Sequence, residues 1–535
     1  MGREANVDSI RALEEQIKEH ERTIIKLKRA RNSLLNVSTL PPEVLGNIFR
    51  WNVTLKDDFD GLEEGSHNFS LVCHYWSEVA SRTPELWTFW GNNFEDWEKR
   101  YLRSSVTAPF DLVLDGLTHM FGCVSESQQM VLKDRATRDT IRRVHLQSDI
   151  HSLLTSIITP LLSPSGGLRT NSLESLILDC EDQTPLDVSF VAHSRLSKLR
   201  RLELANCTIS SWDHLTSQIT LLTTLQLFVN DISPMPTMPQ LLSILASNPY
   251  IQSLELNQQV IPNDHGDDDE SCQIQLHHLK NLRLDGVTGQ VFGLLRRLKH
   301  PKRMSNLTLN ITRCMATDLS QRIGPYLQTY LQRRGGSRNG LGLCLSSSTY
   351  ITFSVGDVHK FHPSTSLPPQ MDSFVSTTVG LNQALPDNVL GKLALDLIAH
   401  TPREEVVYFR TCSSLEAVKD LRGLLPNLKA LDLYRVPLSA VFPTLDPDGY
   451  RALQIFPPSL KFLCLHRPHL NAYNWAPLIT FLSHRASSDN QLDTLLIGGP
   501  CHMCSLVSLR VRKMVREFKI DDECLESWCP LGSCL

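Results

Sequence analysis

The sequence predicts an α/β protein: an N-terminal helix and a small all-helical segment, followed by a long, irregular array of short parallel strands and helices. Three observations lead to this class. Apolar residues recur at heptad spacing in residues 1–37, residues 38–90 carry two apolar helical stripes, and one leucine phrase returns along residues 141–500. We assign residues 91–140 to a linker and first cap of the array, and residues 501–535 to a cysteine-rich C-terminal cap.

The first segment is a charged helix with an apolar stripe. Its stripe steps by three and four residues through Ile10, Leu13, Ile17, His20, Ile24, Leu27, Arg31 and Leu34. Glu, Lys and Arg dominate the positions between, and Pro41 and Pro42 would stop the helix. Two interpretations stay open: a short coiled coil through which the protein self-associates, or a single amphipathic helix packed on its own chain.

The second segment reads as two helices joined by a polar insert. Prolines open the first helix, and apolar residues at 44, 45, 48 and 49 recur at one-turn spacing. After the acidic insert at 52–68, apolar residues at 71, 72, 75, 76 and 79 again fit one face, and Pro84-Glu85-Leu86-Trp87 closes the unit. A unit of about 45 residues encloses little core, so its apolar excess predicts packing against another protein.

Three sub-motifs in this segment resemble, in order, those of the F-box. Residues 40–49 match its Leu-Pro-x-Glu-Val/Leu-Leu-x-x-Ile-Phe opening, residues 72–76 its Val-Cys-x-x-Trp middle, and Leu86-Trp87 its end. That ending, with residues 101–104 and 109–114, looks like the expanded F-box families of mushroom-type fungi. The long acidic insert departs from the family pattern.

The resemblance implies docking onto the Skp-type adaptor, and through it onto a cullin, of a cullin–RING ubiquitin ligase. The residues expected to bind the adaptor are Leu40, Pro41, Val44, Leu45, Ile48, Phe49, Leu71, Val72 and Trp76. Trp76 and Trp87 also fit an internal core role, because large aromatic side chains are usually buried.

Beyond residue 100 the phrase Leu-x-x-Leu-x-Leu recurs, often followed by Cys or Asn. Its copies begin at Leu173, Leu199, Leu222, Ile251, Leu279, Met304, Leu428, Leu460 and Leu492, with a weaker one at Ile141. The spacing resembles that of leucine-rich repeats and predicts a strand followed by a helix in each unit, as in residues 240–246 and 291–298. A chance pattern in another α/β fold is the alternative. Between residues 310 and 428 the register is poor: 343–345 and 407–409 fit strands, and 361–386 reads as a loop.

Residues alternating with the strand leucines should line the open face of such a solenoid, where a target protein would bind. An ordinary exposed sheet face is the alternative. The candidates are Arg201, Glu203, Gln226, Phe228, Glu255, Arg283, Asp285, Asp432, Tyr434, Phe462 and His466. The acidic stretch at residues 261–270 lacks the spacing of a calcium loop and reads as solvated.

Composition narrows the function classes. A formal net charge of −4 gives no electrostatic case for nucleic acid or an anionic membrane as partner. No apolar run is long enough for a spanning helix, and the N-terminus lacks a secretory pattern, so we expect a soluble protein of the cytoplasm or nucleus. The 14 cysteines then read as reduced thiols.

No motif of nucleophilic, phosphate-binding or dinucleotide chemistry occurs, so we predict no catalytic residues, no cofactor and no metal. The one cluster that suggests otherwise is C-terminal: Cys501 and Cys504, then Cys524, Cys529 and Cys534. A closed zinc ribbon usually has two Cys-x-x-Cys pairs, and only one is present. The leading prediction is a non-enzymatic substrate receptor. A scaffold that acts without a ligase, and a metal-dependent enzyme at these cysteines, are the alternatives.

Overall fold

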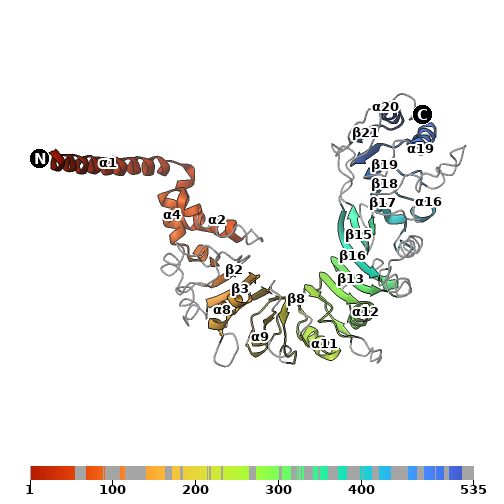
Figure 1. The fold of residues 1–535 in the computed structure, drawn as a ribbon, viewed down its shortest axis with the longest axis horizontal. Helices are drawn as coiled ribbons and strands as arrows, with labels where there is room; N and C mark the ends of the chain where they lie inside the picture. The colour runs from red at the N-terminus through yellow and green to blue at the C-terminus, as the bar shows by residue number, and fades with distance from the viewer. Residues whose placement is uncertain are drawn as a thin grey trace. The chain divides into compact units, whose positions relative to one another are not determined.

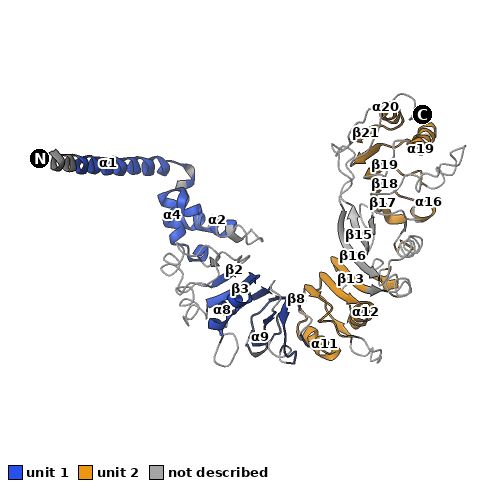
Figure 2. Cartoon of the chain, in the orientation of Figure 1, with its two compact units in different colours: residues 1–234 blue, residues 235–535 orange. Residues whose placement is uncertain are grey.

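The structure, a computed structural model, describes residues 2–54, 68–87, 89–90, 109–114, 140–162, 172–180, 341–347, 350–358, 371–381, 421–434, 456–466, 491–498 and 505–520, and parts of 185–330, 398–411 and 475–490. The chain divides into two compact units, residues 1–234 and 235–535 (Figure 2). The division falls inside the segment assigned to one array. Helices and mainly parallel strands make up the fold (Figure 1), which confirms the α/β class.

The N-terminal part of unit 1 is helical. Its elements are α1 (Gly2–Ser33), η1 (Asn36–Thr39), α2 (Pro42–Thr54), α4 (His74–Ser81) and η3 (Pro84–Trp87), and residues 68–72 are also helical. Proline at the first position of α2 loses no hydrogen bond there. At the start of α4 the Cys73 sulfur accepts a hydrogen bond from the backbone N–H of Trp76 at 3.5 Å.

A parallel ladder follows in unit 1. Its strands pair in the order β1, β2, β3, β4, β6, β8, that is Phe89–Trp90, Phe110–Leu114, Ile141–Ser148, Ser175–Cys180, Arg201–Ala205 and Thr224–Phe228. Two short strands, β5 (Leu186–Asp187) and β7 (Cys207–Thr208), pair separately. The helices between are α8 (His151–Leu161) and α9 (Ser189–His193). Strands β1 and β2 both precede residue 141, where the array was predicted to begin: β1 lies in the segment 38–90, and β2 lies in the segment assigned to a linker and first cap.

The strand register places the repeated leucines in rows. One row joins Val144, Leu176, Leu202 and Leu225, and the next joins Leu146, Leu178, Leu204 and Leu227. All eight side chains are buried, and α8 packs against β3 with five buried apolar residues of its own. Side chains alternate across a strand, so each copy of the phrase contributes two residues to one continuous core.

Unit 2 also contains parallel strands, but they form two runs with an antiparallel insert between them. Parallel pairing joins β9 (Ser253–Leu256), β11 (Asn281–Val287) and β13 (Asn306–Cys314), and a later run joins β17 (Val406–Thr411), β18 (Ala430–Tyr434), β19 (Phe462–His466), β20 (Thr494–Gly498) and β21 (Glu517–Ile520). A small pair joins β10 (Ile274–Gln275) and β12 (Leu298–Lys299). Helices are α11 (Met238–Ser247), α12 (Thr288–Arg297), α16 (Leu421–Leu424), α19 (Ala476–Ser487) and α20 (Ser505–Met514).

An antiparallel insert separates the two parallel runs. Strands β14 (Leu341–Ser347), β15 (Tyr350–Val358) and β16 (Met371–Leu381) pair in turn as antiparallel neighbours, while β16 pairs with β13 and β14 with β17, both in parallel. The insert therefore crosses the sheet in the reverse of its chain order. The prediction of a loop over residues 361–386 was wrong for β16, whereas residues 343–345 and 407–409 do lie in strands.

Three predicted features lie outside the described residues: most of the acidic insert at 52–68, the acidic residues of the 261–270 stretch, and all five C-terminal cysteines. Among the helices that the structure does describe, none has the length and apolar character to cross a bilayer.

Candidate docking surface

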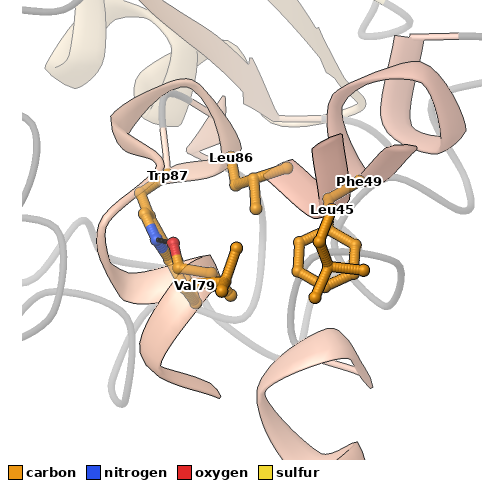
Figure 3. Close-up of a cluster of buried hydrophobic side chains, with 6 residues drawn as sticks. Leu45, Phe49, Val79, Leu86 and Trp87 are labelled. Carbon is orange, nitrogen blue, oxygen red and sulfur yellow. Dashed lines mark hydrogen bonds between the residues drawn. The ribbon is translucent and has the colours of Figure 1, made fainter. Parts of the chain in front are cut away.

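The helical module of residues 40–87 has its own small core (Figure 3). Leu45 and Phe49 of α2 meet Val79 and Ala80 of α4, and η3 adds two more side chains. The six buried residues, each 3% exposed or less, are Leu45, Phe49, Val79, Ala80, Leu86 and Trp87. Three short helical elements thus share one cluster.

The module is closed by the Pro84-Glu85-Leu86-Trp87 turn. The Trp87 indole donates a hydrogen bond to the carbonyl of Ala80 at 2.6 Å, so its one polar atom is satisfied within the core. Phe49 stacks on Phe69, with ring centroids 4.4 Å apart, and Trp76 tilts against both. Trp76 is only partly buried and packs at the margin of the cluster.

Gly46 lets α2 approach the end of α4 closely. A Cβ atom at this position would lie 3.0 Å from Oγ1 of Thr83, which itself donates to the carbonyl of Val79. We expect Gly46→Leu to lower the free energy of unfolding by about 1–3 kcal/mol through overpacking. Chemical denaturation checks this, and the loss should shrink in a Thr83→Ala background. An equal loss in both backgrounds would contradict the contact.

The outer face of α2 carries an apolar stripe that the core does not use. Val44 is 43% exposed, Ile48 47% and Trp51 70%. These three residues follow one another at spacings of about one helical turn and lie on one side of the helix. We call Val44, Ile48 and Trp51 the α2 stripe. Trp51 was not predicted from the sequence, although it continues the spacing of the other two.

The predicted adaptor-binding residues separate into two groups. Pro41, Val44, Ile48, Leu71 and Val72 are exposed, with Leu71 at 65% and Val72 at 56%. Leu45 and Phe49 are fully buried in the module's own core, so in this structure they offer no surface to a partner.

Leu40 and Trp76 are intermediate between these groups. Leu40 packs at the margin of the core, where its carbonyl accepts a hydrogen bond from the Tyr75 hydroxyl.

Charged residues of the helical module form exposed ion pairs. Arg50 contacts Glu85 at 3.2 Å, and Arg82 contacts Glu78 at 2.9 Å. Exposed pairs of this kind contribute little to stability, about 0–1 kcal/mol each.

The strand face predicted to bind a target also carries local charge pairs. In unit 1 the Arg201 guanidinium lies 2.6 Å from Glu203, while Gln226 and Phe228 are half-buried. In unit 2 Arg283 lies 3.2 Å from Asp285 and 4.0 Å from Glu255. Each of these acidic residues has a basic neighbour, so these strands present a mixed surface with exposed arginines at 201 and 283.

The later strands of unit 2 depart from this prediction. Asp432 is 0% exposed and Phe462 5%, so neither is available on an open face. His466 is partly exposed, and the Tyr434 side chain lies outside the described residues. Burial raises the pKa of Asp432 above its usual range. The charges of His466 and Arg410, and hydrogen bonds from the side chains of Tyr408 and Cys464, oppose that rise.

The apolar residues of α1 at the heptad positions are exposed along the helix. The exposed fraction ranges from 51% at Ile24 to 66% at Leu27, with Ile10, Leu13 and Ile17 between these values. Within the described residues, α1 therefore does not bury its stripe against its own chain. This observation favours the first of the two interpretations left open by the sequence.

In comparisons with known proteins, no protein-family model and no curated protein matched the chain.

Proposed function

We propose that the protein is the substrate-recognition subunit of a Skp–cullin–F-box ubiquitin ligase. In this proposal residues 38–90 are an F-box that docks the Skp-type adaptor, and the strand array is a leucine-rich-repeat-like solenoid that binds a target in the cytoplasm or nucleus. The α2 stripe carries the proposal: it is apolar and exposed on a module whose own core is already complete. The protein itself would contribute proximity rather than a chemical step.

Burial of the α2 stripe in a partner would release its apolar surface from water, which is the main driving force of association. The stripe lies on one face of α2, whose other face is held by Leu45 and Phe49 in the core. A partner with an apolar groove could therefore bind α2 without opening the module.

The test is capture of the purified Skp-type adaptor by the full chain. Val44→Asp with Ile48→Asp places two charges in the proposed interface, and we expect affinity to fall by about 100-fold or more. Leu506→Asp with Leu509→Asp is the matched control, because both leucines are exposed on α20, at 53% and 57%, far from the module in sequence. Leu45 is unsuitable for this test, since a charge there would unfold the core.

Failure of the wild-type chain to bind the adaptor, or unchanged binding by the Val44/Ile48 variant, would contradict the proposal. Retained target association without any adaptor binding would instead support a scaffold that acts outside a ligase. Both variants should keep the wild-type far-UV spectrum, because the substituted side chains are exposed.

We further expect self-association through α1. Light scattering of the full chain should give a dimer, and Ile17→Glu with Ile24→Glu should give a monomer, because the charges would face each other across the heptad contact. Ile25→Glu is the matched control: Ile25 is 49% exposed and adjacent to Ile24, but lies off the heptad positions. A monomeric wild-type chain, or a dimer that survives the double substitution, would contradict this expectation.

A further inference from the structure

Three side chains of different chemistry converge on one face of strands β18 and β19. Asp432 lies opposite Cys464 in the strand register, and His466 follows Cys464 by two residues, which places it on the same face. One ligand atom from each (a carboxylate oxygen, a thiol sulfur and an imidazole nitrogen) lies within 4.8 Å of the other two. This face is opposite to the buried row of Leu431 and Leu463.

The imidazole of His466 and the carboxylate of Asp432 lie close enough for both to reach one ion. Nε2 of His466 lies 3.8 Å from Oδ1 of Asp432, too far for a hydrogen bond between them. Two ligands of a tetrahedral zinc ion, each bonded at about 2.0–2.2 Å, lie roughly 3.5 Å apart. A small movement of side chains would therefore admit the ion.

The two oxygens of Asp432 have different surroundings. Oδ2 accepts a hydrogen bond from the Tyr408 hydroxyl at 3.2 Å and lies 3.6 Å from Nε of Arg410. Oδ1 is buried and accepts no hydrogen bond from any residue that the structure describes. A buried carboxylate oxygen that accepts no hydrogen bond is destabilising, so the fold maintains it against a free-energy penalty. Tyr408 and Arg410 hold the carboxylate from one side and leave Oδ1 directed at His466.

We propose that Asp432, Cys464 and His466 form a metal site that binds one zinc ion. Imidazole, thiolate and carboxylate together are a zinc donor set, and softer or harder cations match fewer of the three. Tyr408 and Arg410 act as outer partners that orient the carboxylate. The Arg410 charge is compatible with the ion because the carboxylate and the thiolate together supply two negative charges.

Zinc binding at this site releases a proton. The thiol of Cys464 gives up its proton to solvent as the Zn–S bond forms. His466 is 21% exposed, so the ion can reach the site and a water or an external ligand can take the fourth position. This inference does not depend on the proposed function.

The test uses the purified full chain, equilibrated with zinc, desalted, and analysed for bound metal. We expect about one zinc per chain, and for the cobalt-substituted protein a thiolate-to-metal charge-transfer band. Cys464→Ser and His466→Gln should each lower zinc affinity by about 10-fold or more. Cys207→Ser is the matched control, because Cys207 is also a buried cysteine but belongs to unit 1.

The C-terminal cysteines are the competing source of zinc. Cys501→Ser with Cys504→Ser should leave the bound metal unchanged, and loss of zinc in that variant alone would overturn the assignment. A wild-type chain that binds no zinc, or retention of zinc by both Cys464→Ser and His466→Gln, would overturn it as well. His466→Gln alters a partly exposed side chain, so its unfolding in the presence of a chelator should match that of the wild-type chain.

Discussion

Trp87→Ala should lower the free energy of unfolding of the helical module by about 3–5 kcal/mol. The substitution empties the centre of the only cluster that joins α2, α4 and η3 among the described residues, and removes the hydrogen bond to the Ala80 carbonyl. A module of this size has little other core to compensate. The chain has two compact units, so hydrogen exchange of the α2 and α4 amides is a better readout than global unfolding.

Two further variants serve as comparisons for Trp87→Ala. Trp87→Phe keeps one six-membered ring but loses the pyrrole ring with its N–H donor, so a smaller loss of about 1–2 kcal/mol is expected. Trp51→Ala is the exposed counterpart and should have little effect on amide protection, because the Trp51 side chain is 70% exposed. Equal losses of protection in Trp87→Ala and Trp51→Ala would contradict this account of the core.

Arg485→Met should lower the free energy of unfolding of unit 2 by about 3–5 kcal/mol. The Arg485 side chain is 2% exposed, and its guanidinium donates to four backbone carbonyls, those of Pro457, Pro458, Leu460 and Asn490, at 2.7 to 3.2 Å. Burial lowers the pKa of Arg485 to about 10, so the group stays charged at neutral pH. Methionine fills the space but leaves the carbonyls without their donor.

The measurement is chemical denaturation with probes in unit 2, compared with Arg510→Met, an exposed arginine on α20. Arg485→Lys should fall between the two, because it keeps the charge but cannot span the same set of carbonyls. Arg485 fixes α19 against the turn that precedes β19. We therefore also expect Arg485→Met to weaken zinc binding at Cys464 and His466. A loss of stability no larger than that of Arg510→Met would contradict the role assigned to this residue.

The sequence predicts the strand ladder well because leucine spacing and strand periodicity are local. Leu176 and Leu178, for example, must face one side of any strand that contains them, and the register with Leu202 and Leu204 follows from stacking the copies. The helix predicted at 240–246 lies within α11, and the one predicted at 291–298 matches α12 up to Arg297, while Leu298 already belongs to β12.

Strand β16 was missed because serine and proline around it favour a loop, and its own signal, the β-branched Val375, Thr377 and Val379, is weak without a neighbour. Its pairing with β15 and β13 is a long-range property.

The sequence could not predict which residues of one helix or strand are buried and which are exposed. Val44, Leu45, Ile48 and Phe49 all fit one wide apolar stripe, and only packing against α4 and η3 separates the buried pair from the exposed pair. Asp432 and Phe462 occupy the same alternating positions beside strand leucines as Arg201 does, yet their side chains are buried. The cluster of Asp432, Cys464 and His466 spans two strands that are separated by many residues in the chain, so no local motif predicts it.

Hydrogen exchange of the full chain with and without the purified Skp-type adaptor tests the central claim most directly. If residues 38–90 dock the adaptor, exchange should slow in α2 and in residues 68–72, whose exposed apolar side chains would become buried, while the β18 and β19 amides remain unchanged. Unaltered exchange in α2 at saturating adaptor, or protection confined to the strand array, would contradict the claim.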